Sequence, residues 1–375
     1  MGRLRKSSKN MVEHFSLPSV IFDTHVHLRG WEESHKTTPY RVLWEAFHSL
    51  INVCVGMPNT CPVIDSLGVG IKYLTQEINP AAGIIGMSKP QLLYVGLTDS
   101  NFGEVREFLK LPQAAGGKIY PAGEVTTGKV GIAKKSSILW HMCNIAEADK
   151  VLAVHCADPQ IYQEKNGDTM EGEVKYLEKI LNLTYPLRRW LKLVVCHVSG
   201  KASAEMILQA QNEGYRNLFI ELTPHHLWFD NAGTHWNPSV DPVFYHCLNG
   251  LRGPEDREFL ISLAANEQIK NLIIGSDSAC HTTAEKLSDK APGGIPSNRE
   301  LVPVMITLAK EYGISEKRIA NLISFNPARL FGTDVPRKLV KYRIVKQKDN
   351  LRYNNGIVTN PWNGSDFYFP VERLD

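Results

Sequence analysis

The residues most suited to chemistry lie near the start of the chain, in the stretch Asp23-Thr24-His25-Val26-His27. Side chains two positions apart on a β-strand point to the same face, so Asp23, His25 and His27 are expected to lie together. Two imidazoles at this spacing can hold one divalent metal ion, and zinc is the usual choice for nitrogen ligands. The alternative is a pair of histidines at a strand end with ordinary hydrogen bonds.

The elements that must position these residues are buried strands alternating with helices. The predicted strands cover residues 19–22, 51–55, 91–97, 116–121, 151–155, 191–197, 218–222 and 271–275. The predicted helices cover 42–50, 67–78, 101–110, 136–149, 171–181, 202–213, 256–265, 301–312 and 316–324. This order means parallel strands with crossover helices, and eight units predict an α/β fold of the (β/α)8 TIM-barrel class. A doubly wound open sheet is the alternative, but no G-x-G-x-x-G follows the first strand.

The predicted barrel is preceded and followed by shorter segments and contains one long insertion. The barrel is expected over residues 19–335, and residues 336–375 are expected to form a short C-terminal tail packed on it. Residues 1–18 form a basic arm, whose first ten residues predict disorder and carry no apolar stretch of the kind found in a secretory signal. The 224–226 segment is expected to be an exit loop, and residues 228–253 a long polar insertion.

Composition excludes several functional classes. The chain has 375 residues, of which 43% are hydrophobic and 22% charged, as in ordinary globular proteins. A net charge of +3 argues against a nucleic-acid or membrane surface, and no apolar run approaches the roughly 18 residues of a membrane span. Seven cysteines without C-x-x-C spacing predict reduced thiols in a soluble, cytoplasmic protein.

Chemistry in such barrels sits at the carboxyl ends of the strands. One histidine after one strand is more often structural than a ligand. Here two further apolar strands end in histidine, and a later one ends in aspartate, which together favour a metal centre. In chain order the strand ends carry His25 and His27, Asn59, Lys118, His155, His197, His225 and His226, and Asp277.

Lys118 resolves a problem of charge. Four histidines and one aspartate carry too little negative charge for two dications. A lysine desolvated at a barrel mouth can become a neutral amine, which can add carbon dioxide and become a carbamate that bridges two metals. The alternative is a salt-bridged barrel lysine, and the surrounding histidines favour the carbamate.

These motifs resemble the amidohydrolase superfamily and, within it, the dihydroorotases. H-x-H with a late aspartate is specific only to the superfamily. Three further motifs are specific to dihydroorotases. They are H-x-H-x-R ending at Arg29, M-P-N-T around Asn59, and Asp277 followed four residues later by His281. The resemblance spans residues 22–329. Segments 223–227 and 291–296 resemble the multifunctional-type branch and 118–122 the short bacterial-type branch. The flanking β-sandwich of many superfamily members is expected to be reduced or absent.

The resemblance implies reversible closure of N-carbamoyl-L-aspartate to L-dihydroorotate, with loss of water, in de novo pyrimidine biosynthesis. It implies two Zn2+ per chain, bridged by N6-carboxylated Lys118 and a hydroxide. One zinc would be held by His25, His27 and Asp277, and the other by His155 and His197. Asp277 would also be the catalytic acid and base.

Further residues match the family's substrate contacts. Arg29, Asn59 and His281 match the positions at which the family binds the substrate carboxylate. Thr126 and Thr127 resemble a threonine pair on a loop that closes over the substrate. Asn249 resembles the asparagine of an N-P-P-L-R segment, although the prolines are missing here.

Two other functions remain open from the sequence. A cyclic amidase for hydantoins, dihydrouracil or allantoin would act on substrates without the ring carboxylate, and Arg29 with His281 argues against it. An inactive barrel acting as a scaffold should have lost metal ligands, whereas all six positions are intact. The expected partners are the small-molecule substrate and a second copy of the chain in a homodimer.

Overall fold

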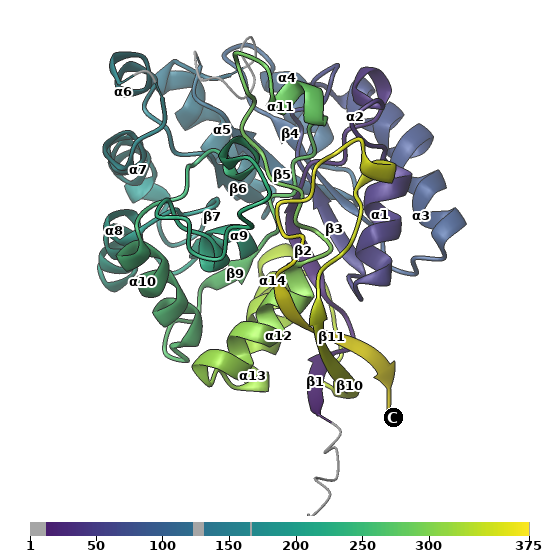
Figure 1. Cartoon of the computed structure of the whole chain (residues 1–375). Helices are drawn as coiled ribbons and strands as arrows, with labels where there is room; N and C mark the ends of the chain where they lie inside the picture. Colours follow the sequence, from purple (N-terminus) through teal and green to yellow (C-terminus); the bar gives the residue numbers. More distant parts are fainter. Residues whose placement is uncertain (1–12, 123–130, 166, 375) are drawn as a thin grey trace, which may run out of the picture.

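The structure is a computed structural model and describes residues 13–122, 131–165 and 167–374. Its centre is an eight-stranded parallel sheet in which each strand pairs with the next along the chain (Figure 1). The strands are β2 (Phe22–Val26), β3 (Val53–Gly56), β4 (Leu92–Gly96), β5 (Ala114–Ile119), β6 (Val151–Val154), β7 (Lys192–Val195), β8 (Leu218–Leu222) and β9 (Leu272–Ile274). The predicted (β/α)8 barrel is confirmed, and the open doubly wound sheet is excluded.

The barrel closes just beyond the last strand. The backbone N–H of Asp277 donates to the carbonyl of His25 at 2.8 Å, and the N–H of His27 donates to the carbonyl of Ser278 at 3.0 Å. These bonds join the end of β2 to the segment that follows β9. The closure therefore brings the first and last candidate ligands together.

Helices surround this sheet, as crossover connections of parallel strands require. They are α1 (Pro39–His48), α2 (Leu67–Tyr73), α3 (Asn79–Ile85), α4 (Phe102–Phe108), α5 (Lys135–Glu147), α6 (Pro159–Glu164), α7 (Met170–Thr184), α8 (Lys201–Asn212), α9 (Pro224–Trp228), α10 (Pro254–Ala265), α11 (Thr283–Lys286), α12 (Leu301–Tyr312), α13 (Glu316–Ala320) and α14 (Asn326–Phe331). Two π-helical segments, η2 (Leu74–Ile78) and η5 (Asn321–Phe325), join α2 to α3 and α13 to α14. The 3-10 turns are η1 (Trp31–Glu33), η3 (Tyr185–Leu187), η4 (Pro242–Tyr245) and η6 (Asn354–Gly356).

The apolar core has two layers that follow strand alternation. In β6, Val151 and Ala153 belong to a buried cluster inside the barrel, whereas Leu152 and Val154 belong to the larger cluster between barrel and helices. Successive side chains on a strand point to opposite faces, which produces this division. The same alternation directs His155, the next residue of odd number, toward the barrel mouth.

The exit from β8 corrects one prediction. Residues 224–226 were expected to form a loop, but they begin α9. The side chain of Thr223 caps this helix by accepting the backbone N–H of His226, and Pro224 occupies the first helical position. Both features favour a helix start, because they satisfy or remove backbone donors that lack partners there.

The two flanks of the barrel meet in a second, smaller sheet. β1 (His14–Pro18), which lies within the predicted N-terminal arm, pairs antiparallel with β10 (Leu339–Lys348), and β10 pairs with β11 (Asp366–Arg373). Figure 1 shows these three strands together beside α12, on which β11 packs. The first ten residues, for which disorder was predicted, lie outside the described residues. Within the described residues, the segments before and after the barrel thus pair in one three-stranded sheet.

Within the described ranges, no helix combines the length and the apolar character needed to cross a membrane.

Candidate functional site

The candidate ligands that the structure describes gather at the carboxyl end of the barrel strands. His25 lies in β2 and His27 directly follows it, Lys118 lies in β5, and His155, His197 and Asp277 follow β6, β7 and β9 within three residues. All six are buried, and the most accessible of them, His27, is 8% exposed. Parallel strands bring their carboxyl ends to one rim, so residues far apart in the sequence become neighbours.

Unusual backbone conformations help to direct the side chains at this rim toward one another. Val194 and Cys196 face the barrel interior, so His197 would face outward if β7 simply continued. Instead His197 has a positive φ of 40°, and Asp277 and Arg29 have φ values of 46° and 56°. Non-glycine residues rarely adopt this region, and such conformations cluster at active sites. The strained backbone turns these side chains toward a common centre.

His25, His27 and Asp277 form the first half of the centre. Oδ1 of Asp277 lies 3.1 Å from Nε2 of His25 and 3.0 Å from Nε2 of His27. Burial lowers the pKa of both imidazoles, which keeps them neutral and able to offer a lone pair. These three side chains therefore have the positions and the protonation states that a metal ion needs.

His155 and His197 form the second half. Nδ1 of His155 lies 3.1 Å from Nε2 of His197, and the two ring centroids are 4.8 Å apart. Burial and then the charge of His155 lower the pKa of His197 well below its usual value. The ring of His197 also lies 5.3 Å from that of His25, which places the two halves side by side.

Lys118 lies fully buried between the two halves. Its ammonium donates to Sγ of Cys196 at 2.8 Å. Its charge contributes to the lowered pKa values of His25, His27 and His197, so it is close to ligands of both halves. This is the place that a bridging group would occupy.

The sequence prediction missed Glu221, a carboxylate behind the first half. Its Oε1 accepts from Nδ1 of His25 at 2.7 Å, and its Oε2 accepts from Oγ1 of Thr24 at 3.1 Å. Metal-binding histidines commonly donate their second ring N–H to a carboxylate, which fixes the tautomer. The available signal was a single acidic residue in an otherwise apolar strand, Leu218–Leu222, and Glu221 also adds negative charge that the prediction did not count.

The donor set fits zinc. Imidazole nitrogen and carboxylate oxygen bind zinc at about 2.0–2.2 Å, which places neighbouring ligand atoms in a tetrahedral shell about 3.3 Å apart. The separations of 3.0 and 3.1 Å around Oδ1 of Asp277 are close to this value. In the second half, Nδ1 of His197 is buried without a hydrogen-bond partner among the described residues. Such a nitrogen is costly unless something binds it.

Arg29, Asn59 and His281 lie beside this centre. Nη2 of Arg29 donates to Nε2 of His281 at 3.2 Å, and Nη1 of Arg29 donates to Oε1 of Glu33 at 3.2 Å. After burial, Arg29 is the largest cause of the lowered pKa of His27, and Asn59 also lies against that ring. The structure therefore brings these three residues together on one side of the first half.

Asn249 is buried near the same end of the barrel. Neither its Oδ1 nor its Nδ2 has a hydrogen-bond partner in the part of the chain described. Its main-chain carbonyl accepts from Nε2 of His226 at 3.0 Å, and the charge of His226 contributes to the pKa of Asp277. Thr126 and Thr127, the other predicted substrate contacts, lie outside the described residues.

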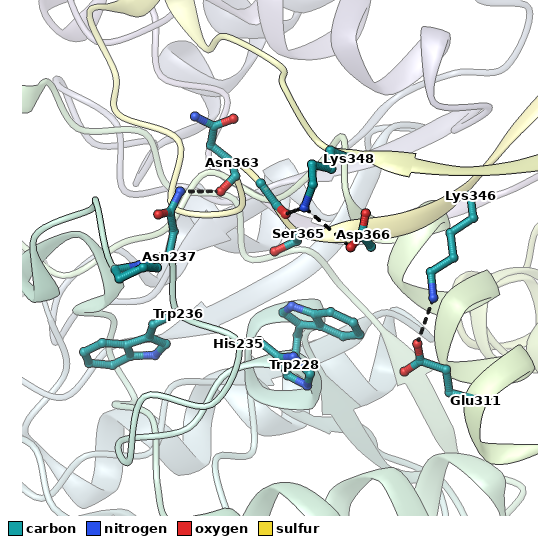
Figure 2. Close-up of a pocket in the computed structure, with 12 residues that line it drawn as sticks. Trp228, His235, Trp236, Asn237, Glu311, Lys346, Lys348, Asn363, Ser365 and Asp366 are labelled. Atoms are coloured by element: carbon teal, nitrogen blue, oxygen red, sulfur yellow. Dashed lines mark hydrogen bonds and ion pairs between the residues drawn. The ribbon is translucent and has the colours of Figure 1, made fainter.

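A cavity of about 560 Å³ elsewhere is not part of this site (Figure 2). It lies between the segment after α9 and the small sheet. The charged groups along it are paired, Lys346 with Glu311 at 3.8 Å and Lys348 with Asp366 at 3.6 Å. None of the candidate metal ligands lines it, so it is not a competing position for the chemistry.

Sequence comparison finds similarity to known dihydroorotases. No family model matches the chain. A dihydroorotase of Halalkalibacterium halodurans is 28% identical over 83% of this chain and 72% of its own length. A dihydroorotase of Thermococcus kodakarensis is 30% identical over 84% of this chain and 68% of its own length.

Solved structures show the same fold. A dihydroorotase of Saccharomyces cerevisiae, in complex with 5-fluoroorotic acid, superimposes with a TM-score of 0.80 at 18% identity, covering 96% of this chain and 99% of that one. An L-hydantoinase of Arthrobacter aurescens superimposes with a TM-score of 0.79 at 21% identity, covering 96% and 84%.

The barrel fold, together with the sequence similarity to dihydroorotases, places the chain in the amidohydrolase superfamily. Within that superfamily the chain belongs to the dihydroorotase family, a family of enzymes that hydrolyse cyclic amides.

Proposed function

We propose that the protein is a zinc-dependent dihydroorotase that interconverts N-carbamoyl-L-aspartate and L-dihydroorotate in pyrimidine biosynthesis. The observation that carries this proposal is the position of Arg29. Its guanidinium contacts His281 and acts electrostatically on His27, a candidate metal ligand. An arginine there can pair with the ring carboxylate of dihydroorotate through two charge-assisted hydrogen bonds. Hydantoin and dihydrouracil have no such carboxylate.

The proposed ligands are His25, His27 and Asp277 for one zinc ion and His155 and His197 for the other, with carboxylated Lys118 between them. Zinc bound there would polarise the amide carbonyl and lower the pKa of a water molecule. The complete burial of Lys118 between the two halves supports this role, because a carbamate formed there would lie between the two groups of ligands. Such a carbamate should appear as a labelled carbonyl signal by NMR when the enzyme is prepared with ¹³C-bicarbonate, and Lys118→Ala should lose the signal.

Asp277 is the proposed acid and base. Burial raises the pKa of its carboxyl group above the usual value, which makes the carboxylate a better proton acceptor. In hydrolysis it would take a proton from the attacking water and deliver it to the ring nitrogen that leaves. In ring closure the same carboxyl group would start protonated. Arg29, Asn59, His281 and Asn249 would hold and orient the substrate.

The test compares substrates on zinc-loaded protein. We expect kcat/KM for dihydroorotate to exceed that for dihydrouracil or hydantoin by roughly 10⁴-fold, as sites built around a polar group reject analogues that lack it. Asp277→Asn should lower turnover in both directions by orders of magnitude. Comparable turnover of dihydrouracil by the unmutated protein would show a general cyclic amidase instead.

We also propose that the enzyme is a cytoplasmic homodimer. All seven cysteines are free thiols, which supports a reducing compartment.

The dimer interface is proposed to include α1 and α3. Tyr40 and Trp44 on α1 are 45% and 41% exposed, and Ile84 on the adjacent α3 is 74% exposed. Exposed large apolar side chains on neighbouring helices can mark an interface. Light scattering after gel filtration should give twice the chain mass, and Ile84→Glu should reduce it to one chain if this face is the interface.

A further inference from the structure

A second group of potential metal ligands lies outside the candidate centre. It consists of His225 and His226 in α9 and Cys247 in the segment that follows η4. One ligand atom from each lies within 4.8 Å of the other two. The three residues are 0%, 2% and 1% exposed. We call this group the HHC cluster.

His225 is the most unusual member. It is completely buried, yet neither of its ring nitrogens has a hydrogen-bond partner among the described residues. Burial, followed by the charge of His226, lowers the pKa of His225 well below its usual value, so the ring is neutral. A neutral imidazole with an unused lone pair is the form that binds a metal. Without a ligand this buried polar group costs stability.

The other two members point at one atom. Nε2 of His226 lies 3.0 Å from the carbonyl oxygen of Asn249, and Sγ of Cys247 lies 3.2 Å from the same oxygen. These separations are close to those between neighbouring ligands of a tetrahedral metal site. Nδ1 of His226 lies 2.8 Å from Oγ1 of Thr223, so it can donate to that hydroxyl and leave Nε2 with a free lone pair.

We propose that the HHC cluster binds a third metal ion, a zinc-like dication, through His225, His226 and Cys247, with the carbonyl oxygen of Asn249 as the fourth ligand. The set contains two imidazole nitrogens and one thiolate, which suit zinc. Binding releases one proton, because the Cys247 thiol must become a thiolate, while the proton of His226 only moves from Nε2 to Nδ1.

This ion would connect two parts of the barrel mouth. α9 continues directly from β8, whereas Cys247 and Asn249 belong to the segment between η4 and α10. A metal shared by both would fix the position of the buried Asn249 side chain. His225, His226 and Cys247 are not among the proposed ligands or substrate contacts, so this ion could bind whether or not the protein has dihydroorotase activity.

The first test is a difference in zinc content. The full-length protein would be saturated with zinc, passed over a desalting column and measured by elemental analysis. We expect the unmutated protein to hold one more zinc per chain than either Cys247→Ser or His225→Gln. Cys54→Ser, which removes another buried thiol, is the matched control and should keep the full amount. Because only the difference is read, the result does not depend on how many ions the candidate centre holds.

Cobalt gives an independent readout. In the cobalt-substituted unmutated protein, a thiolate ligand produces a charge-transfer absorption band in the near ultraviolet. This band should be present in Cys54→Ser and absent in Cys247→Ser. The proposal is overturned if the unmutated protein shows no such band, if the band survives Cys247→Ser, or if it is lost only in Cys196→Ser. If Cys247→Ser fails to fold, Cys247→Ala gives the same readout, and absence of the band in the unmutated protein overturns the proposal without any variant.

Discussion

Arg29 illustrates how one residue can decide which cyclic amide is accepted. Arg29 is 6% exposed, its guanidinium bonds to Glu33 on one side and to His281 on the other, and its Nε has no hydrogen-bond partner within the described ranges. A preorganised, partly unsatisfied cation of this kind gains more from an anionic substrate than from a neutral one.

We therefore expect Arg29→Met to lower kcat/KM for dihydroorotate by roughly 100- to 1000-fold, the loss of two charge-assisted hydrogen bonds. Turnover of dihydrouracil should change little. Steady-state assays with both substrates measure this, and Arg343→Met in β10, whose side chain is 42% exposed, is the control. An equal loss on both substrates would show that Arg29 supports the centre rather than selecting the carboxylate.

Glu221 provides a second test at the level of a single residue. The carboxylate accepts from Nδ1 of His25, so it orients Nε2 toward Asp277. We expect Glu221→Gln to weaken zinc binding by about tenfold, as removal of such outer partners usually does. Competition with a coloured chelator measures this affinity. Glu372→Gln, which changes a carboxylate paired with Arg343 in the small sheet, should leave it unchanged, and a similar effect of both variants would contradict the positioning role.

Among the elements, β5 contains the glycine with the least room for a side chain. Gly116 has a φ of 153°, and a Cβ built there would lie 1.8 Å from the carbonyl oxygen of Val151 in β6. The strand can approach its neighbour only because this position has no side chain. Lys118 follows two residues later, so the same close approach sets the depth at which its amine lies.

Gly116→Ala should therefore lower the free energy of unfolding by roughly 2–4 kcal/mol and reduce zinc content. Gly103→Ala in α4 is the matched control, because a Cβ there meets nothing within 4 Å and alanine favours helices. Thermal unfolding followed by circular dichroism, with elemental analysis, compares the two. Equal stability of both variants would show that the β5–β6 contact can relax.

In the whole molecule, metal and fold should depend on each other. The candidate ligands come from five strand ends, including those of the first strand, β2, and the last, β9. An ion bound to them would therefore connect the two strands between which the barrel closes. A ligand that binds only the folded state stabilises it by about 4 kcal/mol when present at a thousand times its dissociation constant.

Chelation should therefore lower the midpoint of thermal unfolding by several degrees and abolish turnover, and added zinc should restore both. The measurement is a melting curve with and without chelator, using His14→Ala in the small sheet as a comparison that should respond like the unmutated protein. Full activity in thoroughly metal-free protein would refute the proposed chemistry.

Local sequence patterns determined the order of elements and the identities of the candidate ligands. Apolar runs alternating with helical patterns predicted all eight barrel strands, because burial on both faces makes a parallel strand apolar throughout. Polar residues at the ends of such runs stand out, which is why His155, Lys118 and Asp277 could be named in advance.

Tertiary structure decided what depends on contacts between distant residues. Glu221 joins His25 only because β8 and β2 lie on the same barrel, and the left-handed backbone of His197 has no local sequence signal. Likewise, β1 pairs with β10, more than 300 residues away in the sequence, and no local pattern in either segment specifies its partner. Local periodicity reports which face of an element is buried, whereas the partner on that face is selected by packing and closure of the whole chain.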